Sequence, residues 1–385
     1  MSLRIRQELA LAQAARYREA NRSEKGHILR EFVEATGYHR KYAIMLLRHP
    51  PQPVGKRRTR KRRRVYDDTV RHALAHVWEI AGYICGKRLV AGMRDLLESL
   101  ERHGELQLET LTRSRLLAIS AATADRLLRE FRVHHNLRGI CTTKPGTLLR
   151  HQIAVRTSHD WTENTPGFFE IDLVAHCGES THGEYLHSLV LTDVHIGWTE
   201  CLALPNRSQR AVTDAIHSVR HRLPYPILGI DSDNGSEFIN HLLANYCAQH
   251  HIKFTRCRPY KKNDQCHVEQ KNWAIVRRIV GYDRFEGQAP LRHLRSLYAQ
   301  LRLFTNFFQP SSRLTGKTRN GSRVTKHYDK PTTPYRRLRE AGILSDEDRA
   351  QLQELFEGLN PAALQRQIRE ARQRLFQSCN SQNRI

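Results

Sequence analysis

The sequence predicts a multidomain protein with an α/β core, in which helices surround a mixed five-stranded sheet, preceded by all-α regions. Two observations predict this class. Short β-branched and aromatic runs alternate with helical patterns between residues 168 and 280. Before residue 133, the apolar periodicity is helical. The length of 385 residues exceeds that of one typical domain, so several domains are expected.

The charge balance points to a polyanionic partner. Lysine and arginine total 63 against 39 acidic residues, which gives a formal net charge of +24. Nucleic acid is the partner that such an excess favours. No run approaches the roughly 18 apolar residues that span a bilayer, and charges at Arg4, Arg6 and Glu8 interrupt any signal peptide. We therefore expect a cytoplasmic protein with no membrane partner.

The eight cysteines are scattered, and no two stand in a C-x-x-C spacing. Reduced thiols are therefore expected in place of a disulfide framework. A structural zinc site is an alternative. Its conceivable ligands are His134, His135 and Cys141, or His250, His251, Cys257, Cys266 and His267.

Residues 1–50 predict a helix-turn-helix DNA-binding region. Leu9, Ala12 and Ala15 recur at helical spacing, and Gly37 ends a second helix before a third begins. The helix after such a turn enters the major groove of DNA. The residues expected to face DNA are Tyr38, His39, Arg40 and Lys41. A small helical bundle with a solvated basic face is the alternative.

Residues 51–66 predict a basic linker. It begins with a proline-rich run, and residues 56–64 are all lysine or arginine except Thr59. Like charges in this block repel one another into an extended arm unless phosphates neutralise them. The arm residues expected to contact DNA are Arg57, Arg58, Arg60, Lys61 and Arg62.

Two further helical regions flank the core. Residues 67–133 predict a second helical DNA-binding region, with Ser120 as the N-cap of its last helix. Residues 134–165 lack a clear period and are expected to be a connector. Residues 286–385 predict a C-terminal helical and basic region. Within it, residues 315–334 predict a loop or a small irregular β unit, and Asn360 is expected to cap the last helix.

The core, residues 166–285, follows a recognisable order of elements. Three strands precede a helix, a strand, a helix, a strand and a helix, which is the order of a ribonuclease H-like core. The expected strands are residues 168–174, 185–194, 198–204, 227–230 and 252–257. The expected helices are residues 208–222, 237–250 and 268–280.

Acidic residues stand on three of these elements, and the first is Asp172 within the first strand. An isolated carboxylate in a buried strand would cost several kcal/mol of desolvation, so Asp172 must be paired or bound to a metal ion. The second is Asp233, in an Asp-Asn-Gly turn after the fourth strand. Gly235 permits a sharp exit that leaves the Asp233 carboxylate at the carboxyl end of the strand. Asp231 is the runner-up, and Glu237 suits the start of the following helix.

The third acid, Glu269, opens the last core helix. Lys271, Arg277 and Arg278 give this helix basic faces that could follow a phosphate backbone beside the acid. Asp264 is the rival ligand, but a loop holds geometry less well than a helix does.

Ligation by carboxylates alone selects hard divalent cations such as Mg²⁺ or Mn²⁺. Two such ions about 3.5–4 Å apart stabilise both the attacking and the leaving oxygen of a phosphodiester displacement. We therefore expect two ions, with Asp172, Asp233 and Glu269 as the catalytic and metal-holding residues. The nucleophile would be water for strand cleavage, or a DNA 3′-hydroxyl for joining.

These three acids carry a family resemblance. Asp172 in Phe-Phe-Glu-Ile-Asp, Asp233 in Asp-Asn-Gly-Ser-Glu-Phe and Glu269 in Val-Glu-Gln-Lys-Asn resemble the catalytic triad of the retroviral-integrase superfamily of DDE transposases. The 35 residues between the last two acids match the D,D(35)E spacing of that family. The chain is similar to bacterial insertion-sequence transposases that carry helix-turn-helix domains before the core. Since no His-His-Cys-Cys zinc domain like that of retroviral integrases is found, end recognition is expected of the helical domains.

The resemblance implies a transposase that cleaves strands at the ends of its own mobile element and transfers 3′-hydroxyls to target DNA. It implies double-stranded DNA as the partner, a homo-oligomer on that DNA, and a bacterial, nucleoid-associated location. One alternative is a related metal-dependent nuclease that cuts but does not join. Another is a non-catalytic, domesticated DNA-binding protein that keeps the fold.

Overall fold

The computed structural model describes residues 1–50, 65–131, 154–156, 165–258 and 265–380. The chain divides into two compact units, Met1–Val65 and Tyr66–Ile385. None of the described helices combines the length and the apolar character that a membrane span requires.

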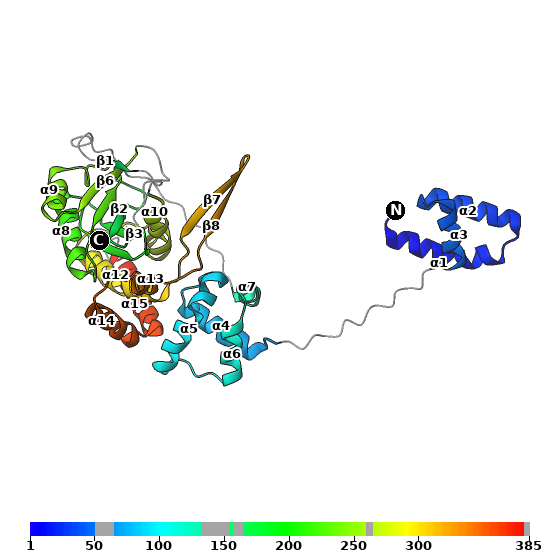
Figure 1. The fold of residues 1–385 in the computed structure, drawn as a ribbon, viewed down its shortest axis with the longest axis horizontal. Helices are drawn as coiled ribbons and strands as arrows, with labels where there is room; N and C mark the ends of the chain where they lie inside the picture. The colour runs from blue at the N-terminus through cyan, green and yellow to red at the C-terminus, as the bar shows by residue number, and fades with distance from the viewer. Residues whose placement is uncertain (51–64, 132–153, 157–164, 259–264, 381–385) are drawn as a thin grey trace. The chain divides into compact units, whose positions relative to one another are not determined.

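Three helices form the first unit (Figure 1): α1 (Leu3–Glu19), α2 (Arg22–Thr36) and α3 (Arg40–Arg48). Gly37 ends α2 with a φ of 68°, a left-handed conformation that glycine adopts without steric cost. The helices enclose a core of Ala10, Tyr17, Ile28, Leu29, Phe32, Ala43, Leu46 and Leu47. The expected first helix is present, and its buried residues are Ala10, Ala14 and Tyr17, whereas Ala12 and Ala15 are exposed.

A mixed sheet in the order β1-β6-β5-β2-β3-β4 organises the second unit. Its strands are β1 (Ala154–Arg156), β2 (Phe168–Ala175), β3 (His187–Asp193), β4 (Thr199–Leu204), β5 (Gly229–Ser232) and β6 (Lys253–Cys257). β5 pairs in parallel with both β2 and β6, whereas β3 is antiparallel to β2 and β4. The predicted five-stranded mixed sheet is confirmed, and the short strand β1 extends it along β6.

Helices cover both faces of this sheet (Figure 1). α8 (Gln209–Arg222) packs against β4, α9 (His241–Gln249) packs against β6, and the two helices pack against each other. The predicted last core helix consists of α10 (Cys266–Lys271), a π-helical segment (Asn272–Arg277) and α11 (Arg278–Val280). The long helix α12 (Gln288–Phe308) follows. Glu170 and Asp172 of β2 contact the segment that begins with α10. Ser188 of β3 pairs with Val174, which lies on the same face of β2 as these acids, and Ser188 contacts Tyr298 of α12. α10 and α12 therefore cover the same face of the sheet.

The remaining helices share the hydrophobic core of this unit. They are α4 (Asp68–Ile80), α5 (Gly86–Arg102), α6 (Thr110–Ala118), α7 (Ala121–Leu127), a 3₁₀ turn (Arg129–Phe131), α13 (Pro334–Glu340), α14 (Asp346–Gly358) and α15 (Pro361–Asn380). The two predicted caps are present, since Ser120 Oγ accepts from Thr123 N–H and Asn360 Oδ1 accepts from Ala362 N–H. Asp95 of α5 pairs with Arg336 of α13, which joins the middle helices to the C-terminal ones.

An antiparallel hairpin lies between α12 and α13. Its strands are β7 (Leu314–Asn320) and β8 (Arg323–Tyr328), in the stretch where the sequence predicts a loop or a small β unit. It is a separate two-stranded sheet. Figure 1 shows it projecting away from the α/β body of its unit.

Candidate active site

Parallel pairing brings Asp172 and Asp233 to one level of the sheet. β2 and β5 run side by side, and Ile171 is the register partner of Ser232, so each acid follows a paired residue. Glu269 lies in the first turn of α10, which packs on β2 and β3. Asp172 within β2 and Asp233 directly after β5 therefore lie at one level of the sheet, and Glu269 lies on the helix that packs against β2.

Glu170 fixes the helix that carries Glu269. It lies on β2 two residues before Asp172, hence on the same face of the strand, and is fully buried. Its Oε2 accepts from the backbone N–H groups of His267 at 2.8 Å and Val268 at 2.9 Å. N–H groups of a first helical turn have no partner within the helix, and the N-cap residue of α10 offers no side-chain bond. A side chain of β2 therefore caps α10.

Sequence reasoning missed Glu170, although its signal was present. Two acids at alternate positions of a strand, as in Glu-Ile-Asp, face the same side of a sheet. Burial raises the pKa of Glu170 well above its ordinary value, the two backbone bonds oppose that shift, and the charge of Asp231 adds to it. This face of β2 thus carries a second acidic side chain beside Asp172, and its raised pKa favours the neutral form of Glu170.

Asn272 holds the Asp172 carboxylate. The Asn272 Nδ2 donates to Asp172 Oδ2 at 2.6 Å, and the Leu173 N–H donates to Asp172 Oδ1 at 2.8 Å. Asn272 is the first residue of the π-helical segment, a distortion that is frequent at functional sites. Its own Oδ1 is buried and has no hydrogen-bond partner among the described residues. An acceptor oxygen is therefore available beside the carboxylate.

Burial raises the pKa of two of the acids, and neighbouring carboxylates add to the shift at Asp172. Burial, and then the charge of Asp233, raise the pKa of Asp172 to about 7, and Glu269 adds a smaller effect. Burial raises the pKa of Asp233 to about 6, while the Gly235 N–H, 2.9 Å from Asp233 Oδ1, opposes the shift. A Cβ at Gly235 would lie 3.0 Å from that oxygen, so glycine allows this close approach. A nearby cation would reverse both shifts.

The donor set fits a hard divalent cation, because all three predicted ligands offer only carboxylate oxygens and two have raised pKa values. Within the part of the chain that the structure describes, no three His, Cys, Asp or Glu side chains are gathered closely enough to hold a metal ion. Asp172, Asp233 and Glu269 are among the residues to which this finding applies. It also covers the zinc candidates His250, His251, Cys257, Cys266 and His267. His134, His135, Cys141 and Asp264 lie outside the described residues.

Asp231 and Glu237, the alternatives to Asp233 as the second acid, lie in different surroundings. Asp231 is 1% exposed, is the register partner of Glu170, and accepts from Thr255 Oγ1 at 2.6 Å. It belongs to the interior of the sheet. Glu237 does not start a helix as predicted, because α9 begins at His241 with Asn240 as its cap.

The predicted DNA contacts of the first unit lie at the start of α3. His39, Arg40 and Lys41 are exposed there. Tyr38 is half-buried, packs edge-to-face on Tyr42 at a centroid distance of 5.0 Å, and has the Arg6 guanidinium above its ring. Tyr38 therefore also has a packing role. The linker residues Arg57, Arg58, Arg60, Lys61 and Arg62 lie outside the described residues.

The basic residues after Glu269 differ in exposure. Lys271 is half-buried, and burial together with the charges of Arg88 and Arg337 lowers its pKa to about 8. Arg277 donates to Ala175 O at 3.1 Å and to Gly281 O at 3.2 Å. Arg278, which is exposed, donates to Gly82 O at 2.7 Å. Two of the three predicted DNA contacts thus bind backbone carbonyls of this chain.

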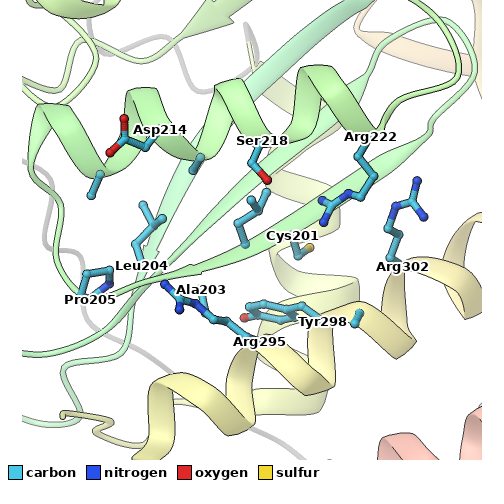
Figure 2. A pocket seen from close by; sticks show the side chains of 14 residues that line it. Cys201, Ala203, Leu204, Pro205, Asp214, Ser218, Arg222, Arg295, Tyr298 and Arg302 are labelled. Atoms are coloured by element: carbon cyan, nitrogen blue, oxygen red, sulfur yellow. The ribbon is translucent and has the colours of Figure 1, made fainter. Parts of the chain in front are cut away.

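A cavity of about 520 Å³ lies elsewhere, over β4 between α8 and α12. Figure 2 shows Arg222 on α8 and Arg302 on α12 among its lining side chains. Both arginines bind the fully buried Glu200, at 2.6 and 2.7 Å. None of the three predicted acids lines this cavity.

Comparison with known proteins identifies the family. Residues 164–262 match the integrase core domain family, a range that contains Asp172 and Asp233. The chain is 44% identical over 340 residues to the uncharacterized protein y4rM of Sinorhizobium fredii (strain NBRC 101917 / NGR234), covering 88% of this chain and 96% of that protein. The chain belongs to the DDE transposase and retroviral-integrase superfamily. An integrase core implies an enzyme of the polynucleotidyl-transferase type.

Solved retroviral integrase cores are also similar to this superfamily member. The BIV integrase catalytic core is 19% identical with a TM-score of 0.30, covering 46% of this chain and 95% of that one. The HTLV-2 integrase catalytic core in complex with magnesium, in its dimeric form, is 18% identical with a TM-score of 0.29, covering 40% and 94%. Membership of the superfamily rests on the family match and on y4rM, not on these scores.

Proposed function

We propose that this protein is a transposase that uses Mg²⁺ or Mn²⁺, held by an all-carboxylate site, to cleave DNA at the ends of a mobile element and to join the 3′-hydroxyls to target DNA. The placement of Asp172 in β2, of Asp233 directly after β5 and of Glu269 in α10 of a chain with an integrase core carries this proposal. The charges of Asp233 and Glu269, which add to the raised pKa of Asp172, support it.

Asp172, Asp233 and Glu269 would hold the metal, as two ions. Bound metal supplies Lewis-acid stabilisation of the attacking and leaving oxygens in a phosphodiester displacement. The chain's own contribution is to hold each carboxylate in place. Asn272 orients Asp172, the Gly235 N–H orients Asp233, and Glu170 caps the helix of Glu269.

The chemistry needs no nucleophile from the protein. In cleavage, a water oxygen bonds to phosphorus and the 3′-oxygen of the element end leaves. In joining, that 3′-hydroxyl oxygen attacks a target phosphodiester, and the target 3′-oxygen leaves with a proton. One phosphorus–oxygen bond forms for each bond that breaks, so joining requires no external energy source.

The helical first unit and the basic linker are proposed to bind the element ends. The exposed His39, Arg40 and Lys41 support this assignment. Since two ends must be joined together, the active form would be a homo-oligomer on double-stranded DNA, in the cytoplasm at a bacterial nucleoid.

A joining assay tests the proposal. Purified full-length protein is given a labelled duplex, taken from the inverted repeats that flank its gene, together with supercoiled plasmid and Mg²⁺. Asp233→Asn and Glu269→Gln should abolish joined product while DNA affinity is kept, and the exposed Asp214→Asn should have no effect. Nicked plasmid without joined product would assign a nuclease instead. Full joining by either acidic-site variant would overturn the role of these carboxylates.

A further inference from the structure

The β7–β8 hairpin is exposed on both faces. Every residue of β8 is exposed, as are Thr318, Arg319 and Asn320 of β7. Its larger apolar side chains are exposed too, with Val324 at 49% and Tyr328 at 51%. A two-stranded ribbon with no buried face is marginally stable alone in water. An ordered ribbon of this kind needs a fixed base or a partner.

The base of the ribbon is fixed to the core. Asp329, which follows β8, accepts from the Arg313 N–H at 2.6 Å and from the Arg337 guanidinium at 3.2 Å. Arg337 is 8% exposed and also donates to Ile196 O at 3.3 Å. Ser311 and Thr332 form a bridge between the two ends of the segment. Polar contacts therefore hold the base, and the rest of the ribbon extends from it (Figure 1).

The charge of the ribbon has one sign. Residues 310–328 contain five lysines and arginines and no acidic residue. Arg313 pairs with Asp329 at the base, and Arg319 donates to Gly321 O at 3.1 Å. Within the described parts of the chain, no carboxylate forms an ion pair with Arg319, Arg323 or Lys326. As far as the structure describes the chain, Arg319, Arg323 and Lys326 therefore form a cationic surface that no carboxylate neutralises.

The base of the ribbon contacts the segment that follows β3. The Arg313 guanidinium donates to His195 O, and the Arg337 guanidinium donates to Ile196 O at 3.3 Å. β3 pairs with β2, the strand that contains Asp172. The ribbon is therefore attached to the sheet on which the candidate site is built.

We propose that the β7–β8 ribbon is a DNA-binding arm that lies in a groove of duplex DNA and contacts phosphates through Arg319, Arg323 and Lys326. The major groove of B-DNA admits a two-stranded β ribbon, and phosphates would neutralise the unpaired charge of this one. The inference rests on the proposed function in taking DNA as the partner. It deepens that function by naming a further surface of the second unit that would hold DNA.

Salt-dependent binding tests the arm. The full-length protein and the triple variant Arg319→Gln, Arg323→Gln, Lys326→Gln are titrated with a duplex of random sequence over a KCl series in EDTA. Each lost phosphate contact lowers the slope of log K against log salt by about 0.9, so the triple variant should lose about 3. Its affinity near 0.1 M salt should fall about a hundredfold. Its melting temperature should not change, because the three side chains are exposed.

A matched variant separates the arm from total charge. Arg94→Gln, Arg210→Gln, Arg374→Gln removes the same charge from helix positions whose side chains are 66%, 88% and 66% exposed. This matched variant should keep nearly all of the wild-type slope of log K against log salt. Three results would overturn the proposed DNA-binding arm. The ribbon variant could bind DNA as the wild type does, or the matched variant could lose as much affinity as the ribbon variant. The ribbon variant could also lose as much affinity for single-stranded DNA as for the duplex. Because EDTA prevents metal-dependent chemistry, these outcomes are independent of whether the wild type joins DNA.

Discussion

Asp172→Asn should stabilise the metal-free protein at neutral pH, although it removes a proposed catalytic carboxylate. Burial and the charge of Asp233 raise the pKa of Asp172 from 3.8 to about 7. The native state therefore binds this proton more tightly than the unfolded state does, and stability falls as the pH rises from about 4 to about 7. This rise of the Asp172 pKa from 3.8 to about 7 corresponds to about 4 kcal/mol of free energy of unfolding. Solvent contact at this half-buried group makes that an upper value.

The asparagine leaves no polar group without a partner. Its Oδ1 can still accept from the Leu173 N–H. Its Nδ2 faces Asn272, whose amide can turn over so that its unpartnered Oδ1 accepts. At about 2 °C per kcal/mol for a unit of this size, the melting temperature near pH 7.5 should rise by up to about 8 °C. Near pH 5 the gain should be small, because Asp172 is already protonated in the native wild type.

Thermal melting of the full-length protein, in EDTA or excess MgCl₂ at both pH values, checks this prediction. Mg²⁺ should stabilise the wild type near pH 7.5 far more than near pH 5, because protons compete with the metal for the carboxylates. The variant should gain less from Mg²⁺ at either pH, and Asp214→Asn should behave as the wild type does. A variant that melts below the wild type near pH 7.5 in EDTA would refute the reasoning, as would an equal response of both proteins to Mg²⁺.

Three other substitutions test positioning and the two-unit organisation. Glu170→Ala removes the acceptor of two first-turn N–H groups of α10 and should lower the free energy of unfolding by about 1–2 kcal/mol and the joining rate at least tenfold. Glu170→Gln keeps an acceptor and should lower both quantities less. Equal losses in the two variants would argue against capping. Asn272→Leu should lower joining about 10- to 100-fold without changing DNA affinity, and wild-type joining would exclude its role in orienting Asp172. Gly37→Ala should lower the free energy of unfolding of the first unit by about 1 kcal/mol, because φ at this position is 68°, although no atom lies within 4 Å of the added Cβ. Only the melting temperature of the first unit should shift.

The core elements could be predicted because their signals are local, whereas the roles of the three acids stay predictions. Each strand is a short run of β-branched and aromatic residues, and Asp233 is identified by the turn that follows its strand. The predicted order of elements matches the sheet from β2 to β6. Even so, Ala10, Ala14 and Tyr17 form the buried face of α1, because packing against α2 and α3 selects among several apolar stripes.

The supporting contacts of the site could not be predicted, because each joins residues far apart in the sequence. Glu170 caps a helix 97 residues further on, and Asn272 reaches back 100 residues to Asp172. The π-helical segment that begins at Asn272 has no periodic signature of its own. The β7–β8 ribbon escaped a firm prediction because neither of its faces is buried, so its sequence shows no alternation of apolar and polar residues.

Cysteine substitutions test most directly whether the acidic residues hold metal during catalysis. A thiolate is a softer ligand than a carboxylate and binds Mn²⁺ better than Mg²⁺. Joining by Asp233→Cys and Glu269→Cys should fall about a thousandfold in Mg²⁺, which reflects the loss of several kcal/mol of transition-state stabilisation, and should recover in part in Mn²⁺. Asp214→Cys should join as the wild type does in either metal. Wild-type joining in Mg²⁺ by either acidic-site cysteine variant would contradict a metal-holding role for that carboxylate.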